Sequence, residues 1–115
     1  MKAAVIIPAI LAASAAMADG RALLTAAATG DAPAIRAELA AGTPVDTRNT
    51  KGETALLIAT HQNHLDAART LIEAGADVNA KDNIADTPFL YASAEGRIEI
   101  LKAILATGRA NLKDT

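Results

Sequence analysis

The sequence contains no cysteine and little aromatic character, with Phe89 and Tyr91 as its two aromatic residues. The absence of cysteine excludes disulfide bonds, a thiol nucleophile and the modified cysteine that anchors bacterial lipoproteins. Without large aromatic side chains, a core must be built from many contacts among leucine, isoleucine, valine and alanine. This composition favours closely packed helices over a β-sandwich, which relies on β-branched and aromatic residues.

A strong net charge of either sign is also missing. The sequence has 11 lysines and arginines and 13 aspartates and glutamates, which gives a formal net charge of −2. The basic residues are scattered among the acidic ones, so no nucleic-acid surface is expected. The phosphate-binding patterns G-x-x-x-x-G-K-[ST] and G-x-G-x-x-G are absent, and so is the G-x-S-x-G nucleophile elbow. We therefore expect no enzyme and no cofactor, with an enzyme or a site for a small ligand or metal ion kept as the least favoured alternative.

One apolar run is present, and it lies at the N-terminus. The chain begins with MK, whose lysine gives a positive start, continues with small apolar residues over 3–13, and reaches the small-x-small motif AMA at residues 16–18. This arrangement predicts a secretory signal peptide over residues 1–18, which would export the chain to the bacterial periplasm or the medium. A buried N-terminal helix is the alternative, and Pro8 disfavours it. No later segment has the ~20 apolar residues of a membrane span, so no membrane association is expected after cleavage.

The rest of the chain repeats itself every 33 residues. The segment TALLIAT, which begins at Thr54, matches TPFLYAS, which begins at Thr87. A period of this length indicates a stack of small units that bury their apolar faces against one another. The same offset aligns glycine, apolar and small positions: Gly42, Gly75 and Gly108; Leu39, Ile72 and Leu105; Ile35, Ala68 and Leu101; Leu23, Leu56 and Phe89; Ala26, Ala59 and Ala92.

Each unit is predicted to contain two short helices joined by a tight turn. Thr54 and Thr87 stand where a side-chain oxygen can cap the first helix. The turn falls at Gly30, Asn63 and Gly96, because glycine and asparagine tolerate a left-handed backbone. The second helix ends near a glycine, and an extended, hairpin-like loop leads to the next unit.

Two histidines lie three residues apart in the segment HQNH, residues 61–64. This spacing occurs in metal sites, but a zinc site needs three or four ligands, and the sequence has two histidines and no cysteine. Asn63 takes the turn position, and His61 falls at the end of a first helix. We therefore expect a turn that carries surface imidazoles, and no metal site.

The repeated unit resembles the ankyrin repeat. The resemblance rests on the threonine-led first helix, the turn followed by His64, and a second helix that ends in GADVN at residues 75–79. It covers residues 21–115 and implies an all-α ankyrin-repeat solenoid of helix-turn-helix units joined by hairpin-like loops. Leu57 and Leu90 depart from the family, which usually has a histidine at that position.

The predicted organisation is therefore a signal peptide followed by one repeat domain. The domain covers residues 19–115, with units at 19–49, 50–82 and 83–115.

The resemblance also implies a function, because ankyrin repeats bind other proteins through their loop tips and the concave face of their first helices. We expect no catalytic, cofactor or metal residues, and a protein partner that the sequence does not identify. Ile84 stands out, since an apolar side chain at a loop tip has no core to fill, although isolated exposed apolar residues are common. The candidate partner-binding residues are Arg48, Thr50, Lys51, Glu53, His61, Gln62, Lys81, Asn83, Ile84, Asp86, Ala94 and Glu95.

The two ends of the predicted stack differ. The first unit has polar residues for an outer side, with Arg21, Thr25 and Arg36, and with Glu38 at the position of Leu71. The third unit keeps apolar residues throughout, at Phe89, Ile98, Leu101, Ile104 and Leu105. A stack normally requires a polar terminal unit, so we expect either a longer chain or packing of the third unit against another chain. Self-assembly through this end is accordingly the first alternative to binding of a separate partner.

Overall fold

The computed structural model describes residues 20–111, and regular structure in this range is helical apart from one isolated bridge between Arg48 and Thr54. The expected signal peptide, residues 1–18, lies outside the described residues. The all-α class predicted from the sequence is confirmed. No described helix is long and apolar enough to cross a membrane. The helices are α2 (Arg21–Thr29), α3 (Ala32–Ala40), α4 (Ala55–His61), α5 (Leu65–Glu73), α6 (Pro88–Glu95) and α7 (Ile98–Ala106).

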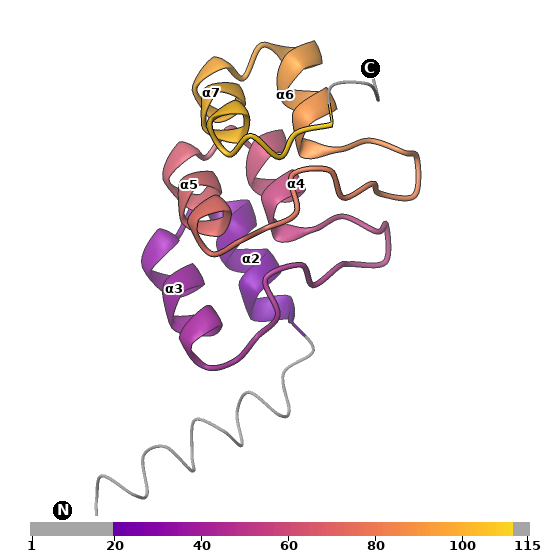
Figure 1. Ribbon diagram of the computed structural model, residues 1–115. Coiled ribbons are helices and arrows are strands. Elements are labelled where there is room, and N and C mark those ends of the chain that lie inside the picture. Colours follow the sequence, from indigo (N-terminus) through magenta and orange to yellow (C-terminus); the bar gives the residue numbers. More distant parts are fainter. Residues whose placement is uncertain (1–19, 112–115) are drawn as a thin grey trace, which may run out of the picture.

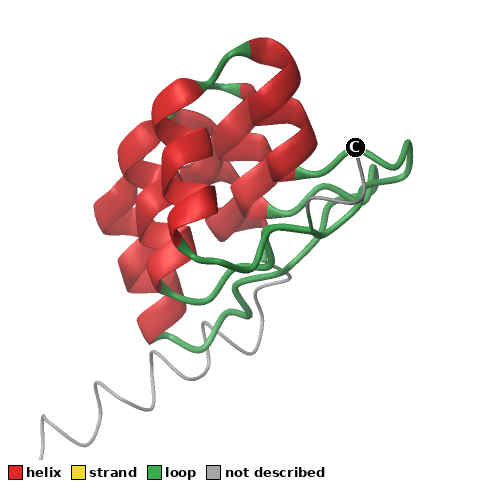
Figure 2. Cartoon of the chain, turned by 45° about the horizontal axis from the view of Figure 1, so that its top comes forward, coloured by secondary structure: helices red, strands yellow, loops and turns green. Residues whose placement is uncertain are grey.

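The helices form three antiparallel pairs that stack in one direction (Figure 1). The first helices α2, α4 and α6 make one column and the second helices α3, α5 and α7 make the other, with contacts between neighbours in each column. The connecting loops leave on the side of the first helices (Figure 1) and project together away from the stack (Figure 2). We call the three layers unit 1 (α2 and α3), unit 2 (α4 and α5) and unit 3 (α6 and α7).

The helix boundaries lie at the capping residues that the sequence predicts. The Thr54 side chain accepts a hydrogen bond from the Leu57 N–H at the start of α4, and Thr87 does the same for Leu90 in α6. The turns between paired helices have left-handed backbones, with φ of 77° at Gly30, 58° at Asn63 and 69° at Gly96. Asparagine is one of the few non-glycine residues that adopt this conformation at modest cost, so the predicted turn positions are confirmed.

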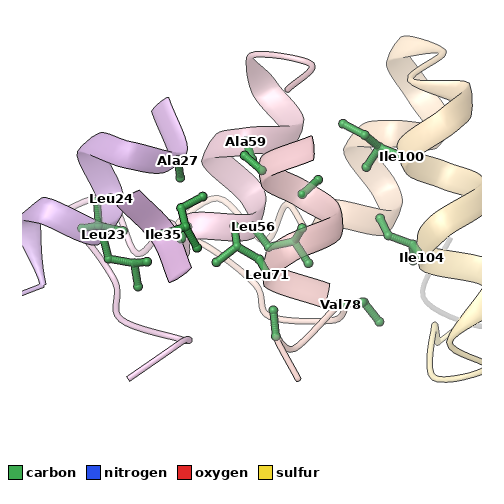
Figure 3. Close-up of a cluster of buried hydrophobic side chains, with 14 of the residues drawn as sticks. Leu23, Leu24, Ala27, Ile35, Leu56, Ala59, Leu71, Val78, Ile100 and Ile104 are labelled. Atoms are coloured by element: carbon green, nitrogen blue, oxygen red, sulfur yellow. The ribbon is translucent and has the colours of Figure 1, made fainter. Parts of the chain in front are cut away.

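A continuous core runs through all three units (Figure 3). Leu23, Leu56, Leu71, Ile100 and Ile104 are completely buried, and they come from four of the six described helices. Each buried leucine or isoleucine stabilises the fold by roughly 1.5–3 kcal/mol through removal of apolar surface from water. The core therefore depends on stacking, because its members in one unit are covered by the next.

Side chains at the helix turns tie each unit to the one before it. The Nε2 atom of His64 lies 3.1 Å from the main-chain oxygen of Ala28, and Arg97 donates to the main-chain oxygen of His61 at 3.1 Å. His64 is half-buried. The sequence predicted surface imidazoles, and the His64 ring keeps only part of its exposure because stacking brings the previous unit against it.

The ends of the stack differ, as the sequence suggests, but three residues lie elsewhere than expected. Arg36 is not confined to the outer side of unit 1, because its Nη1 donates to Thr70 Oγ1 of unit 2 at 3.3 Å. Phe89 and Ile104 are buried in the core and do not form part of an open end. Ile98 and Leu105 are the large apolar residues of unit 3 that remain exposed.

Candidate protein-binding surface

The two long loops, residues 48–54 and 81–87, are each closed by a side chain at the same repeat position. Asn49 Oδ1 accepts hydrogen bonds from the main-chain N–H groups of Lys51 and Glu53, both at 2.9 Å. In the next loop, Asp82 Oδ1 accepts from Ile84 N–H at 3.0 Å and from Asp86 N–H at 2.8 Å. Short polar side chains stabilise turns in this way, so each loop has a defined shape.

The loops are also bonded to one another. The Nδ2 atom of Asn83 donates to the Thr50 carbonyl at 3.0 Å, and the Asn83 main-chain N–H donates to the Lys51 carbonyl at 2.9 Å. Arg48 donates through Nη1 to the carbonyls of Gly52 and Lys81. Arg48 and Asn83, which the sequence nominated for partner contact, thus use their side chains to hold the loops side by side.

A surface hollow of about 320 Å³ lies where the two loop tips meet. Ile84 forms part of its wall and is 82% exposed, the most exposed large apolar side chain among the described residues. Lys51 and Thr50 are further wall residues, and Lys51 is exposed. We call Thr50, Lys51, Asn83 and Ile84 the tip surface.

A second hollow, of about 530 Å³, continues this surface toward the N-terminal end of the stack. It lies between α2 and the first long loop, and Thr50 lines both hollows. Its remaining walls come from Arg21, Leu24, Arg48 and Asn49.

The backbone next to Ile84 is strained. Ala85 has φ of 65°, in the left-handed region that non-glycine residues avoid, whereas the equivalent position in the first loop is Gly52 with φ of 77°. A non-glycine residue in this conformation costs roughly 1–2 kcal/mol. Strained residues of this kind concentrate at functional sites, and this one supports the exposed isoleucine.

Behind the tips, polar side chains from units 2 and 3 meet around His61. Its Nδ1 lies 3.3 Å from Glu53 Oε2 of the first long loop, and its Nε2 lies 3.7 Å from Asp86 Oδ2 of the second. The imidazole also meets the ring of Tyr91 edge-on, with centroids 4.2 Å apart and planes inclined at 67°. The Arg97 guanidinium lies over the same tyrosine ring, 5.9 Å from its centroid. We call Glu53, His61, Asp86, Tyr91 and Arg97 the inner-face cluster.

The inner-face cluster is partly open to solvent, with His61 retaining 25% of its side-chain exposure, Glu53 16% and Asp86 23%. Polar groups with this exposure remain available to a partner while their neighbours fix their positions. The His61 ring thus lies at the surface, as the sequence predicted, but with defined neighbours. Among residues 20–111, no three histidine, aspartate or glutamate side chains are arranged to hold a metal ion.

The remaining candidates lie around these two groups without joining them. Gln62 is exposed at the end of α4, and Ala94 and Glu95 are exposed at the end of α6. Lys81 is exposed at the start of the second long loop, and its carbonyl accepts the hydrogen bond from Arg48.

Sequence reasoning missed three residues of this surface: Asp82, Tyr91 and Arg97. Asp82 lines the hollow beside Ile84. The ring of Tyr91 lies against His61. The repeat offset gives one signal for Arg97, because it occupies the position of His64 one unit later.

The geometry defines a class of protein: a stack of helical repeats whose loops and first helices present one connected, rigid surface. The sequence profile for ankyrin repeats in three copies matches residues 23–114, and the chain belongs to the ankyrin-repeat family. Ankyrin repeats generally mediate protein–protein interaction.

A solved structure supports the same assignment. The crystal structure of an ankyrin repeat domain from Acinetobacter baumannii AYE is similar to this chain, with 52% sequence identity and a TM-score of 0.77. The similarity covers 81% of this chain and 47% of that chain, so this chain spans about half the length of the structure it matches. A search of curated proteins finds no match.

Proposed function

We propose that the chain is a non-catalytic protein-binding module that holds a protein partner through the tip surface and the inner-face cluster. The observation that carries this proposal is the exposure of Ile84. Its apolar side chain is 82% exposed on a loop whose shape is fixed by hydrogen bonds. Burial of such a side chain in a partner removes apolar surface from water. Binding requires little further ordering of the loop, since hydrogen bonds already fix its shape.

The rigidity of the loops supports recognition in a second way. Association costs free energy for each flexible segment that it orders, and a preorganised surface avoids that cost. Bonds from Asn49, Asp82 and Asn83 fix the loops within and between units. These hydrogen bonds also hold the strained backbone conformation of Ala85.

Charge gives the surface its selectivity. Lys51 is exposed at the tip, while the carboxylates of Glu53 and Asp86 lie behind it around His61. Mixed charges of this kind discriminate between partners more than they add affinity. A partner of this module therefore places an apolar side chain against Ile84, an acidic group near Lys51 and a donor toward the inner-face cluster.

The test is capture of a partner from bacterial periplasmic extract by the purified chain and two variants. Lys51→Ala with Ile84→Ala removes two exposed groups of the tip surface, and Arg69→Ala with Glu73→Ala truncates two charged side chains of α5 as the matched control. A protein bound by the parent and the control but lost from the tip variant supports the proposal. Equal capture by all three proteins would show that the partner binds another surface. Stoichiometric capture of a small molecule or a metal ion in place of a protein contradicts the proposal.

Export to the bacterial periplasm is the second part of the proposal. It is supported by the positive start, the apolar run and the AMA motif of residues 1–18. The expected product of expression is a periplasmic protein whose N-terminus is Asp19, which mass spectrometry of the fractionated cells reports. Ala18→Leu enlarges the residue before the cleavage point and should leave the full-length mass. A parent that stays in the cytoplasm at full length would contradict export.

A further inference from the structure

The cleavage point that the sequence predicts lies very close to the start of the folded domain. The AMA motif ends at Ala18, so the bond to be cut joins Ala18 to Asp19, and Gly20 follows directly. Ala18 and Asp19 lie outside the described residues, whereas Gly20 lies within them. The structure around Gly20 therefore determines how much of the chain after this bond is accessible to a protease.

Gly20 belongs to the folded domain. It is buried, and it is the N-cap residue of α2, with a left-handed backbone at φ of 87° and ψ of 0°. Its carbonyl oxygen accepts a hydrogen bond from the main-chain N–H of Leu24 at 3.1 Å. This bond closes the first turn of α2, so regular structure is established from the second residue after the predicted cleavage point.

Gly20 also packs closely against the segment that leads into the first long loop. A Cβ atom added at Gly20 would overlap with the Cγ2 atom of Thr47. Thr47 is itself held, because its Oγ1 donates a hydrogen bond to the main-chain oxygen of Pro44 at 2.7 Å. The Gly20 backbone thus lies directly beneath a fixed side chain.

The rest of α2 anchors this first turn in the core. Leu23 and Ala27 are completely buried, and α2 packs against α3 of its own unit and α4 of unit 2. Gly20 is therefore the start of a packed helix, and its displacement requires the first turn of α2 to open.

Cleavage by a protease requires the opposite arrangement. A bound peptide substrate is held as an extended strand, with residues on both sides of the bond in contact with the enzyme. Gly20 and Arg21 are the second and third residues after the bond, and in the folded chain their backbones are left-handed and helical. The body of unit 1 would also meet the enzyme within two residues of the bond. Folded proteins are cut at such places only when the segment opens.

We propose that removal of the signal peptide and folding of unit 1 exclude one another, so that the peptide is removed while the start of α2 is still unfolded. Hydrolysis of the Ala18–Asp19 bond consumes one water and leaves a carboxylate on Ala18 and an amino group on Asp19. The catalytic groups belong to a signal peptidase. The inference rests on the export proposed above and adds the order of the two events, cleavage first and packing of Gly20 under Thr47 second.

The first test compares the cleavage rates of folded and unfolded full-length precursor by a purified bacterial signal peptidase in one detergent buffer. Leu56 is completely buried, so Leu56→Asp places a carboxylate in the core and should unfold the stack without changing the sequence near the bond. Circular dichroism checks the state of each precursor. The unfolded variant should be cleaved about tenfold faster than the parent, or more. Mass spectrometry should identify a product that begins at Asp19.

The second test moves the folded domain away from the bond. A flexible spacer of about six glycine and serine residues, inserted between Asp19 and Gly20, should raise the cleavage rate of the folded precursor by about tenfold. The same spacer inserted between Lys2 and Ala3 is the matched control. It leaves the distance from the bond to Gly20 unchanged, so this precursor should remain protected while folded.

The results that overturn the proposal differ in what they say about export. Equal cleavage rates for the folded parent and Leu56→Asp contradict the order of events and leave export intact. Protection that persists with the spacer after Asp19 does the same, because proximity of unit 1 would then not be its cause. If no precursor is cleaved between Ala18 and Asp19, the predicted signal peptide is wrong and both proposals fail together.

Discussion

The Nε2 atom of His64 and the main-chain oxygen of Ala28 lie 3.1 Å apart across the boundary between units 1 and 2. Because a carbonyl oxygen only accepts, the histidine donates through Nε2. Arg97 makes the same contact to the oxygen of His61 across the next boundary, also at 3.1 Å. His64 and Arg97 are one repeat apart, so two different side chains have the same structural role. Each satisfies a carbonyl at the C-terminal end of the previous first helix.

Removal of the His64 imidazole should destabilise the stack. His64→Ala is expected to lower the free energy of unfolding by about 1 kcal/mol, because the hydrogen bond from the half-buried imidazole to the Ala28 carbonyl is lost. Urea unfolding followed by circular dichroism measures the difference. The neighbouring exposed residue supplies the control, since Gln62→Ala should change stability by less than about 0.5 kcal/mol. Equal effects of the two substitutions would show that the contact with Ala28 contributes nothing.

Gly30 and Gly96 allow a test of how tightly units 1 and 2 approach. Both end a first helix with a left-handed backbone, at φ of 77° and 69°, so alanine is strained at either position. A Cβ at Gly30 would lie 2.7 Å from His64 Nδ1, whereas a Cβ at Gly96 would meet nothing within 4 Å. The His64 ring is held by its bond to Ala28 and cannot easily move aside.

Gly30→Ala should therefore destabilise the protein more than Gly96→Ala does, by about 1 kcal/mol or more. The two glycine substitutions are then compared in a His64→Ala background. The clash with the imidazole is absent there, so the difference in stability should disappear. A difference that persists without the imidazole would assign the effect to another contact of Gly30.

Ala85 provides a substitution that should stabilise the protein. Its φ of 65° is unfavourable for alanine and readily adopted by glycine, which occupies the equivalent position in the first long loop. Relief of the strain, ~1–2 kcal/mol, exceeds the extra entropy of glycine in the unfolded chain, ~0.4–1 kcal/mol. Ala85→Gly should thus raise the free energy of unfolding by a few tenths to about 1 kcal/mol.

A second alanine-to-glycine substitution gives the control of opposite sign. Ala94 lies in α6 and is exposed, so Ala94→Gly should lower stability by up to about 1 kcal/mol through helix propensity alone. Thermal unfolding of the two variants measures both effects. Destabilisation by Ala85→Gly would contradict the assignment of a left-handed backbone beside Ile84.

Much of the fold could be predicted from the sequence because ankyrin-like stacking places equivalent residues in equivalent environments. The offset that joins Thr54 to Thr87 predicted two capped helices, and both threonines accept the expected hydrogen bonds. Asn63 was correctly placed at the turn, because its conformational tolerance is a local property of the residue. Such features depend on short segments or on the period itself.

The arrangement of the candidate surface could be predicted only in part. Glu53, His61 and Asp86 were each named as candidates, but their meeting depends on how closely units 2 and 3 approach, which the period does not fix. His61 also has no counterpart in the other units, where Ala28 and Ala94 occupy its position, so repetition gives no signal for the cluster. Arg48 was named for partner contact, and only the positions of the neighbouring carbonyls show that its side chain links two loops.

The central claim is that the tip surface and the inner-face cluster bind a protein partner. Its most direct test is hydrogen exchange of the chain with and without the captured partner, read by mass spectrometry at peptide resolution. The account predicts slower exchange in the loops at residues 48–54 and 81–87 and in α4 and α6, with α3 and α5 unchanged. Protection confined to α3 and α5, or to α7, would contradict it, because the partner would then lie on a face that Ile84 does not reach.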